Sequence, residues 1–328
     1  MFIKEQMFED ERGIMMRILV IGAGVLGSYL AHVLVRGGND VTVLARAKRA
    51  AQLQQDGLVI RHYFQRKTTV DRVKVISELR TDDIYDLIFV VMKYNDFPAV
   101  LPLLADNLST NIVLVGNNGD THGMQRFFKE NSRAPQNIVF GFQLSGGIRE
   151  KNGRVISIRM GVQMVLGSLE GEVPFKPVLA QAFRQTKYKL DYPEDINAWL
   201  LSHIVPIVAI TSVSYLHNGD LAKATKDNAR WKQAVALIDE GFSVLNKLGI
   251  KTNPAALVKG VKRHPKLLYQ GMKLVHKLPF MKLVDGSFSE ISALYQAFEP
   301  LKQQAGLPTP AWDDFKQQTF KKYALEQK

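Results

Sequence analysis

Apolar residues follow two different periods in the first part of the chain. Residues 17–21 form a short apolar run that ends at glycines, and residues 28–38 then place apolar side chains at helical spacing. Gly37 and Gly38 are expected to end this helix, and residues 40–44 indicate a second strand. A strand, a helix and a strand within about 30 residues predict a βαβ unit, whose right-handed crossover requires parallel strands.

More strands are indicated further along the chain. Their expected positions are 58–60, 86–92, 111–115 and 137–142. The run 87–92 is apolar throughout, which is typical of a strand that is covered on both faces. Two further apolar runs, 154–159 and 162–167, are separated by Met160 and Gly161 and predict a hairpin.

The pattern changes near residue 190. After Tyr192, strand patterns give way to long segments with helical spacing at 195–217, 228–248 and 289–305. We therefore predict an α/β, Rossmann-type domain with a mostly parallel sheet over residues 17–192. An all-helical domain for substrate binding and dimerisation is expected over residues 193–328. Residues 1–16 carry several acidic side chains and no apolar core, and are expected to be a disordered extension.

Composition narrows the location and the partners. The chain of 328 residues has no cysteine, so disulfides and cysteine-bound metals are excluded; a reducing cytoplasm and no metal site are expected. No apolar stretch reaches the roughly 20 residues that cross a bilayer, so no membrane partner is expected. The net charge of +12 is shared between the two halves, and nucleic-acid-binding motifs are missing. This favours a cationic surface that attracts small anionic molecules.

A glycine-rich motif lies between the first strand and the first helix. Gly22-Ala-Gly24-Val-Leu-Gly27 fits the pattern G-x-G-x-x-G. In such a motif the first glycine allows a tight turn, the second lets the backbone approach a pyrophosphate, and the third lets helix and strand pack closely. The N–H groups at the start of the helix, including those of Val25 and Leu26, would bind the phosphates. A purely structural glycine turn is the alternative.

The end of the second strand bears on the choice of cofactor. An NAD-binding domain has an acidic residue about 20 residues after the motif, where it holds the ribose 2′-hydroxyl. This chain has Arg46 there, followed by Lys48 and Arg49. A guanidinium can bind a 2′-phosphate through two parallel hydrogen bonds, whereas a carboxylate would repel it. We therefore predict NADP(H) as the cofactor, with an ordinary surface role for Arg46 as the alternative.

In the order and spacing of its motifs, the chain resembles the ketopantoate reductase (2-dehydropantoate 2-reductase) family from about residue 17 to its end. The motifs concerned are the glycine motif, the arginine after the second strand, Val91-Met-Lys93, Asn117-Asn118-Gly119, and Ser289-Glu290-Ile291 before Gly306-Leu-Pro-Thr-Pro310. The resemblance implies an enzyme of pantothenate biosynthesis that transfers hydride from NADPH to the carbonyl of a small anionic 2-oxo acid, ketopantoate in the family.

The resemblance also implies roles for three residues. Lys93 matches a lysine that lies beside the cofactor and helps to place the substrate, Asn118 matches an asparagine near the nicotinamide, and Glu290 matches a glutamate that holds the substrate. Each has a simpler alternative. Lys93 could be a solvated residue at a strand end, Asn118 part of a turn, and Glu290 the end of a capping box that begins at Ser287.

The first long helix of the second domain departs from the family's pattern. The family has a lysine there that acts as general acid, and this chain has leucine at the position, Leu200 or Leu201 according to the alignment. Reduction of a ketone leaves an alkoxide that needs a proton. His203 lies within one turn and titrates near neutral pH, so it is the first substitute to consider. The alternatives are Lys93, a structural role for His203, or no proton donor at all.

Residues 259–282 form a basic stretch. They carry seven lysines and arginines, no acidic residue, and interleaved apolar residues. We interpret the stretch as a solvated helix pair over the cleft that attracts an anionic substrate, because Pro265 and Pro279 interrupt any single long helix. An amphipathic surface for acidic lipid or nucleic acid is the alternative.

Three functions stay open on the sequence alone. The first is reduction of a 2-oxo acid by NADPH. The second is an oxidoreductase that acts on a different carbonyl or imine. The third is a non-catalytic NADP(H)-binding sensor that has lost its proton donor. The cofactor site is common to all three.

Overall fold

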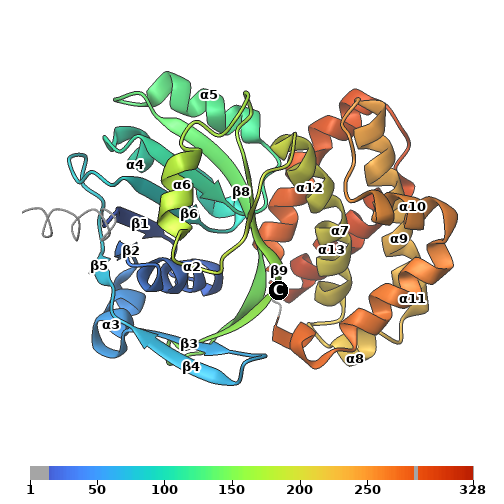
Figure 1. Cartoon of the computed structure of the whole chain (residues 1–328). Coiled ribbons are helices and arrows are strands. Elements are labelled where there is room, and N and C mark those ends of the chain that lie inside the picture. Colours follow the sequence, from blue (N-terminus) through green and yellow to red (C-terminus); the bar gives the residue numbers. More distant parts are fainter. Residues whose placement is uncertain (1–14, 284–286, 328) are drawn as a thin grey trace, which may run out of the picture.

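A twisted sheet with helices on both faces forms one part of the molecule, and a group of helices forms the other (Figure 1). The computed structural model describes residues 15–283 and 287–327. Most of the predicted extension, residues 1–14, lies outside the described residues, and the first strand begins at Arg17 as expected.

All ten described strands belong to one sheet, in the order β4-β3-β9-β8-β7-β6-β1-β2-β5, with β10 paired to β9. They are β1 Arg17–Ile21, β2 Asp40–Leu44, β3 Leu58–His62, β4 Lys67–Asp71, β5 Lys74–Ile76, β6 Leu87–Val91, β7 Asn111–Val115, β8 Asn137–Arg149, β9 Val155–Gly167 and β10 Leu190–Asp191. Among the described pairs, β3–β4 and β8–β9 are antiparallel and the others are parallel. The prediction of a mostly parallel α/β sheet is confirmed.

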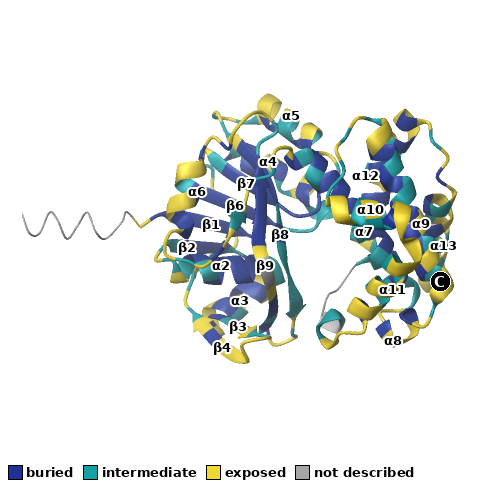
Figure 2. Cartoon of the chain, turned by 45° about the vertical axis from the view of Figure 1, so that its right-hand side comes forward, coloured by how far each residue is buried: buried dark blue, intermediate teal, exposed yellow. Residues whose placement is uncertain are grey.

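Helices cover both faces of this sheet. In β1, Ile18 and Val20 pack on the side of α2 (Val25–Arg36), α3 (Ala47–Asp56) and α6 (Lys176–Phe183). Leu19 and Ile21 pack on the side of α4 (Leu101–Asp106) and α5 (Thr121–Asn131). Figure 2 shows the central strands as buried throughout. This double cover explains why β1, β6 and β7 are apolar without alternation.

The second part of the chain is helical. Its elements are α7 Ile196–Leu216, α8 Leu221–Ala224, α9 Asn228–Lys247, α10 Ala255–Arg263, α11 Pro265–His276, the 3-10 helix η2 Pro279–Leu283, α12 Phe288–Ala305 and α13 Pro310–Glu326. Three of these, α7, α9 and α12, fall where helical spacing predicts them. Their shared core is built around Trp231, Phe242, Tyr295 and Trp312, all fully buried.

Helix α7 is long and apolar. Its length and mean hydropathy of 1.7 would suffice to cross a membrane, but 61% of the apolar window is buried within the protein. The helix packs against α9, α12 and α13 through Val205, Val208 and Ala209. Burial on several sides accounts for its apolar composition without a bilayer.

The hairpin predicted at 154–167 is wrong. Residues 155–167 form one strand, β9, which runs through Met160 and Gly161 and pairs antiparallel with β8. The pairing is interrupted there: four residues of β9 separate Arg159 from Met164, whereas one residue of β8 separates their partners, Ser145 and Gln143. The glycine therefore marks a bulge in a long strand rather than a turn, which is the other common role of glycine in strands.

The change from strands to helices falls between Asp191, the last residue of β10, and Ile196, the first of α7. The division into domains at residue 192 stays a prediction, because Ile196 and Leu200 of α7 pack into the core on one face of the sheet. In the basic stretch, Pro265 begins α11 and Pro279 begins η2. The prolines therefore interrupt the helix as predicted.

Candidate active site

The carboxyl ends of four neighbouring strands bring the predicted site residues to one edge of the sheet. Ile21, the last residue of β1, pairs with Leu44 at the end of β2 and with Val90 in β6. Val91 of β6 pairs with Val115 of β7. The segments that follow these strands hold the glycine motif, Arg46, Lys93 and the Asn117-Asn118 pair. This edge is where open α/β sheets bind ligands.

The three glycines of the motif have different surroundings. Gly22 has φ +103°, and a Cβ there would lie 2.1 Å from the carbonyl oxygen of Val91. A Cβ on Gly27 would lie 1.9 Å from the carbonyl oxygen of Gly22. At Gly24, by contrast, a Cβ would meet no protein atom within 4 Å. Two glycines are therefore required by the fold, and the third faces open space where a phosphate could approach the backbone.

The start of α2 is open to an anion. Gly24 is its N-cap, no side chain caps it, and its first turn has no acidic residue. In the described structure the N–H groups of Val25, Leu26 and Gly27 have no acceptor, and the first such bond runs from Ser28 N to the Gly24 oxygen at 3.1 Å. Free N–H groups and the positive end of the helix dipole are the elements of a phosphate site. The motif therefore fits the diphosphate of a dinucleotide.

Two arginines hold the glycine loop from behind. Arg49 Nε donates to the carbonyl oxygen of Ala23 at 3.2 Å, and Arg149 Nη1 donates to the same oxygen at 3.0 Å. Arg49 is buried and also bonds Gly153 O and Ser28 Oγ. Burial, together with the nearby Arg149, lowers the pKa of Arg49 to about 10. Sequence reasoning missed this role, for which the only signal was the position of Arg49 one turn after Arg46.

Arg46 has the opposite environment. It is the N-cap residue of α3, its side chain is exposed, and no described residue forms an ion pair with it. It follows Leu44, the β2 residue paired with the end of β1, so it starts beside the glycine motif. Its guanidinium is thus available to a ligand that occupies the motif.

Two hydrogen bonds join the strand ends to the helical part. Lys93 Nζ donates to Ser287 Oγ at 2.9 Å, and Asn117 Nδ2 donates to Glu290 Oε1 at 2.9 Å. Lys93 and Asn117 follow paired strands, and Ser287 and Glu290 lie in the first turn of α12. The structure therefore brings Lys93 and Glu290, which are distant in sequence, to the same contact between the sheet and α12.

The two asparagines face different ways. Asn118 is buried: its Nδ2 donates to Met124 Sδ at 3.2 Å, and its Oδ1 accepts from Asp120 N at 2.9 Å. Asn117, which sequence reasoning passed over, instead contacts Glu290, and its buried Oδ1 has no described partner. Asn118 therefore shapes the loop, while Asn117 offers a free acceptor.

The capping-box alternative for Glu290 is not what the structure shows. Ser287 is the N-cap of α12 but forms no side-chain cap bond, and the Glu290 carboxylate accepts a hydrogen bond from Asn117 across the cleft. The carboxylate thus belongs to the contact between the two parts of the molecule. A glycine nearby shows how close this contact is, because a Cβ on Gly119 would lie 2.6 Å from Ala297 Cβ of α12.

His203 lies between two aromatic rings. Its imidazole stacks on Trp199 with ring centroids 5.0 Å apart and contacts Phe142 of β8 at 4.2 Å. Burial lowers the pKa of His203 to about 4, so the ring is neutral at pH 7. Its Nε2 is buried without a described partner. The ring can therefore exchange one neutral hydrogen bond with a ligand, but it holds no ready proton as an acid.

Leucine at the family's lysine position is part of the core. Leu200 and Leu201 are 1% and 4% exposed. Neither side chain can donate a proton.

Three comparisons with known proteins agree with this geometry. Residues 18–171 match the family model "Ketopantoate reductase PanE/ApbA". The chain is 24% identical over 315 residues to a 2-dehydropantoate 2-reductase of Aquifex aeolicus, covering 90% of this chain and 93% of the relative. It is 26% identical over 242 residues to an uncharacterised oxidoreductase of Bacillus subtilis, covering 73% of this chain and 78% of the relative.

Solved structures share the whole fold. A 2-dehydropantoate 2-reductase of Geobacter metallireducens superposes with a TM-score of 0.74 at 19% identity, over 93% of this chain and 99% of that one. A D-mandelate dehydrogenase, solved with NADH and anilino(oxo)acetate, gives 0.74 at 16% identity, over 94% and 98%. Residues 18–171 thus match the ketopantoate reductase PanE/ApbA family model, and the chain as a whole shares the fold of these solved structures.

Proposed function

We propose that this protein is an NADPH-dependent reductase that transfers hydride to the carbonyl of a small 2-oxo acid, with ketopantoate as the first substrate to test. The match of residues 18–171 to the family model and the similarity to a 2-dehydropantoate 2-reductase support an oxidoreductase that acts on a CH–OH group with a nicotinamide cofactor. The observation that carries the proposal is the pair of bonds Lys93–Ser287 and Asn117–Glu290. They join an ammonium, an amide and a carboxylate at the sheet edge that also carries the glycine motif.

The residues of the glycine motif would hold the cofactor. The N–H groups of Val25, Leu26 and Gly27 would bind the diphosphate across the open space at Gly24. The exposed guanidinium of Arg46 would bind the 2′-phosphate, which distinguishes NADPH from NADH. When bound, the cofactor supplies the hydride.

Lys93 is the proton donor that the geometry favours. A lysine ammonium carries a proton at neutral pH, and Nζ of Lys93 reaches Ser287 on the far side of the cleft, so it can also contact a substrate there. It would polarise the carbonyl oxygen and then protonate the developing alkoxide. Glu290 would hold a hydroxyl of the substrate and keep Asn117 in place, and Asn118 would support the loop near the nicotinamide.

His203 has a secondary part in this proposal. With a pKa of about 4 it is a poor general acid at pH 7, but its free Nε2 can make a hydrogen bond to the substrate. If the rate of an active enzyme is the same after His203→Gln, this contact does not exist. Two results together would instead restore His203 as the acid. The rate would be lost in His203→Gln, and the rate of the unmodified protein would rise as the pH is lowered.

A second candidate function is reduction of a different carbonyl or imine. Leu200 and Leu201 favour it, because a cleft without the family's lysine has a different shape and charge from that of the relatives. A non-catalytic NADP(H) sensor is the third candidate. A homodimer, a cytoplasmic location, and the lack of nucleic-acid and membrane partners stay predictions.

Oxidation of NADPH and of NADH, followed at 340 nm with a panel of 2-oxo acids and imines, separates these candidates. Turnover of ketopantoate with a preference for NADPH supports the proposal. Turnover of other substrates alone supports the second candidate. Binding of NADPH without turnover of any substrate supports the sensor.

A further inference from the structure

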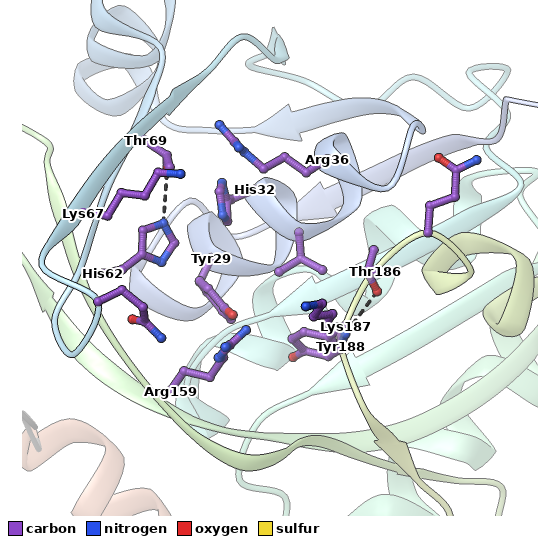
Figure 3. Close-up of a pocket in the computed structure, with 13 residues that line it drawn as sticks. Tyr29, His32, Arg36, His62, Lys67, Thr69, Arg159, Thr186, Lys187 and Tyr188 are labelled. Carbon is purple, nitrogen blue, oxygen red and sulfur yellow. Dashed lines mark hydrogen bonds between the residues drawn. The ribbon is translucent and has the colours of Figure 1, made fainter.

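A second cavity lies beside helix α2, away from the glycine motif (Figure 3). Its volume is about 560 Å³, and its walls come from α2, the β3–β4 hairpin, β9 and residues 185–188. None of the residues proposed to hold the cofactor or the substrate lines it. It is therefore separate from the cleft, and the family resemblance assigns it no role.

Cationic side chains surround this cavity. Arg36, Lys67, Arg159 and Lys187 line it with exposed side chains, and no carboxylate is among the lining residues. Asp71, just outside, binds Arg36 Nε at 2.9 Å. In the described part of the chain the other three cations form no ion pair. Like charges from four different segments thus surround one hollow, and three of them have no ion-pair partner.

The floor of the cavity is buried and partly polar. Tyr29 is 3% exposed, and its hydroxyl has no described hydrogen-bond partner and points into the hollow in Figure 3. His62 Nε2 lies 3.0 Å from Thr69 Oγ1, and the ring of Tyr188 lies 6.3 Å from that of Tyr29. A tyrosine hydroxyl that faces the hollow can donate one hydrogen bond to a ligand and accept another.

The two histidines at the cavity do not add to its charge in the free protein. Burial lowers the pKa of His32, although Asp71 Oδ2, 2.6 Å from its Nδ1, opposes this. Burial, the neighbouring His32 and the surrounding cations lower the pKa of His62 to about 4. Both rings are therefore available at neutral pH as hydrogen-bonding groups beside the cationic rim.

We propose that this cavity binds a small molecule that carries at least two phosphate or carboxylate groups. Its volume lies within the range of about 300–1,000 Å³ that is usual for small-molecule sites. The guanidinium of Arg159 can bind such a group through two parallel hydrogen bonds, and Lys67 and Lys187 can add point charges from two other sides. The Tyr29 hydroxyl would complete the site from below.

Calorimetric titration of the full chain with pyrophosphate and, separately, with citrate tests the proposal. The double variant Lys67→Gln/Arg159→Gln removes two unpaired cations from the cavity. The matched control, Lys232→Gln/Lys321→Gln, removes the same charge from exposed positions on α9 and α13. Arg46→Gln reports whether a probe binds at the cofactor site instead. Thermal unfolding of each variant verifies that it is folded.

We expect at least one probe to bind at one site, with affinity at least tenfold lower in the cavity variant and unchanged in the control and in Arg46→Gln. Tyr29→Phe should weaken binding severalfold. Binding of pyrophosphate alone identifies a phosphate site, and binding of citrate alone a carboxylate site. The proposal is overturned if neither probe binds, if the cavity variant binds as well as its control, or if only Arg46→Gln abolishes binding. None of these outcomes depends on the proposed reductase activity.

Discussion

The two walls of the cleft differ in how they are built. The wall on the side of the sheet consists of strand ends and the first turn of α2, and its central feature is a backbone: three glycines and a row of free N–H groups. The wall on the side of the helices consists of side chains on α7 and α12, such as His203 and Glu290, whose positions depend on how those helices pack. The first wall lies within the residues that match the family model, whereas the second lies outside them.

This difference separates binding of the cofactor, which depends on the backbone of the first wall, from the choice of substrate, which depends on the side chains of the second. A diphosphate has the same shape in every dinucleotide, so the backbone that binds it hardly varies between relatives. Substrates differ, and side chains on helices can be exchanged without disturbing the fold. Leucine at the position of the family's lysine is an exchange of this kind, and our proposal assigns the proton to Lys93 on the other wall.

The largest expected effect tests whether the proton donor lies on the wall formed by the sheet, at Lys93, rather than on the wall formed by the helices. Lys93→Met should lower kcat by about a hundredfold or more, because it removes the proton donor while keeping the length of the side chain. Lys232→Met, at an exposed position on α9, is the control for loss of a positive charge. Steady-state rates with the best substrate of the panel give the comparison. Equal rates for the two variants would return the acid to the helical wall.

The next effect separates cofactor binding from folding within the glycine motif. Gly24→Ala should leave the unfolding temperature unchanged, since its Cβ meets no protein atom within 4 Å. The affinity for NADPH should fall by about thirtyfold, because the added methyl group would overlap with the diphosphate. Gly27→Ala should destabilise the fold by about 2 kcal/mol or more, since its Cβ would lie 1.9 Å from the Gly22 oxygen.

Fluorescence titration with NADPH and thermal unfolding of both variants provide the measurement. If Gly24→Ala binds NADPH as tightly as the unmodified chain, the open space at this glycine is not the diphosphate site, and the contrast between the two walls loses its basis.

A smaller effect concerns the choice of cofactor. Arg46→Gln should lower the affinity for NADPH by about tenfold, as expected for the loss of one charged hydrogen bond, and should leave the affinity for NADH unchanged. Lys48→Gln, on an exposed neighbour, is the matched control. Dissociation constants for both nucleotides decide the matter, and an equal loss for NADPH and NADH would remove the 2′-phosphate from the argument.

The smallest effect is on stability and involves the helical wall alone. The pKa of His203 is about 4 in the folded protein and near 6.5 when unfolded, so the unfolded chain binds more protons in between. The contribution of the buried neutral ring is present above pH 6.5 and is lost as the pH falls towards 4. Urea unfolding from pH 8 to 5 should show less loss of stability for His203→Gln than for the unmodified chain. Parallel curves would mean that the ring is solvated.

The sequence by itself determined the central strands of the sheet, several of the helices and the glycine motif. Strands β1, β2 and β7 begin and end where the apolar runs predict, because a strand covered on both faces must be apolar throughout. The glycine motif could be recognised because its function lies in local backbone geometry, which glycine alone permits. The single strand β9 was missed because a glycine within a strand gives the same local signal at a bulge and at a turn.

Tertiary structure alone decided which side chains meet. Asn117 rather than Asn118 faces Glu290, Arg49 holds the glycine loop while Arg46 stays exposed, and His203 is enclosed by Trp199 and Phe142. The cationic cavity likewise joins residues from four segments that share no motif. Such contacts depend on the packing of elements that are distant along the chain, and a pattern of neighbouring residues carries no record of them.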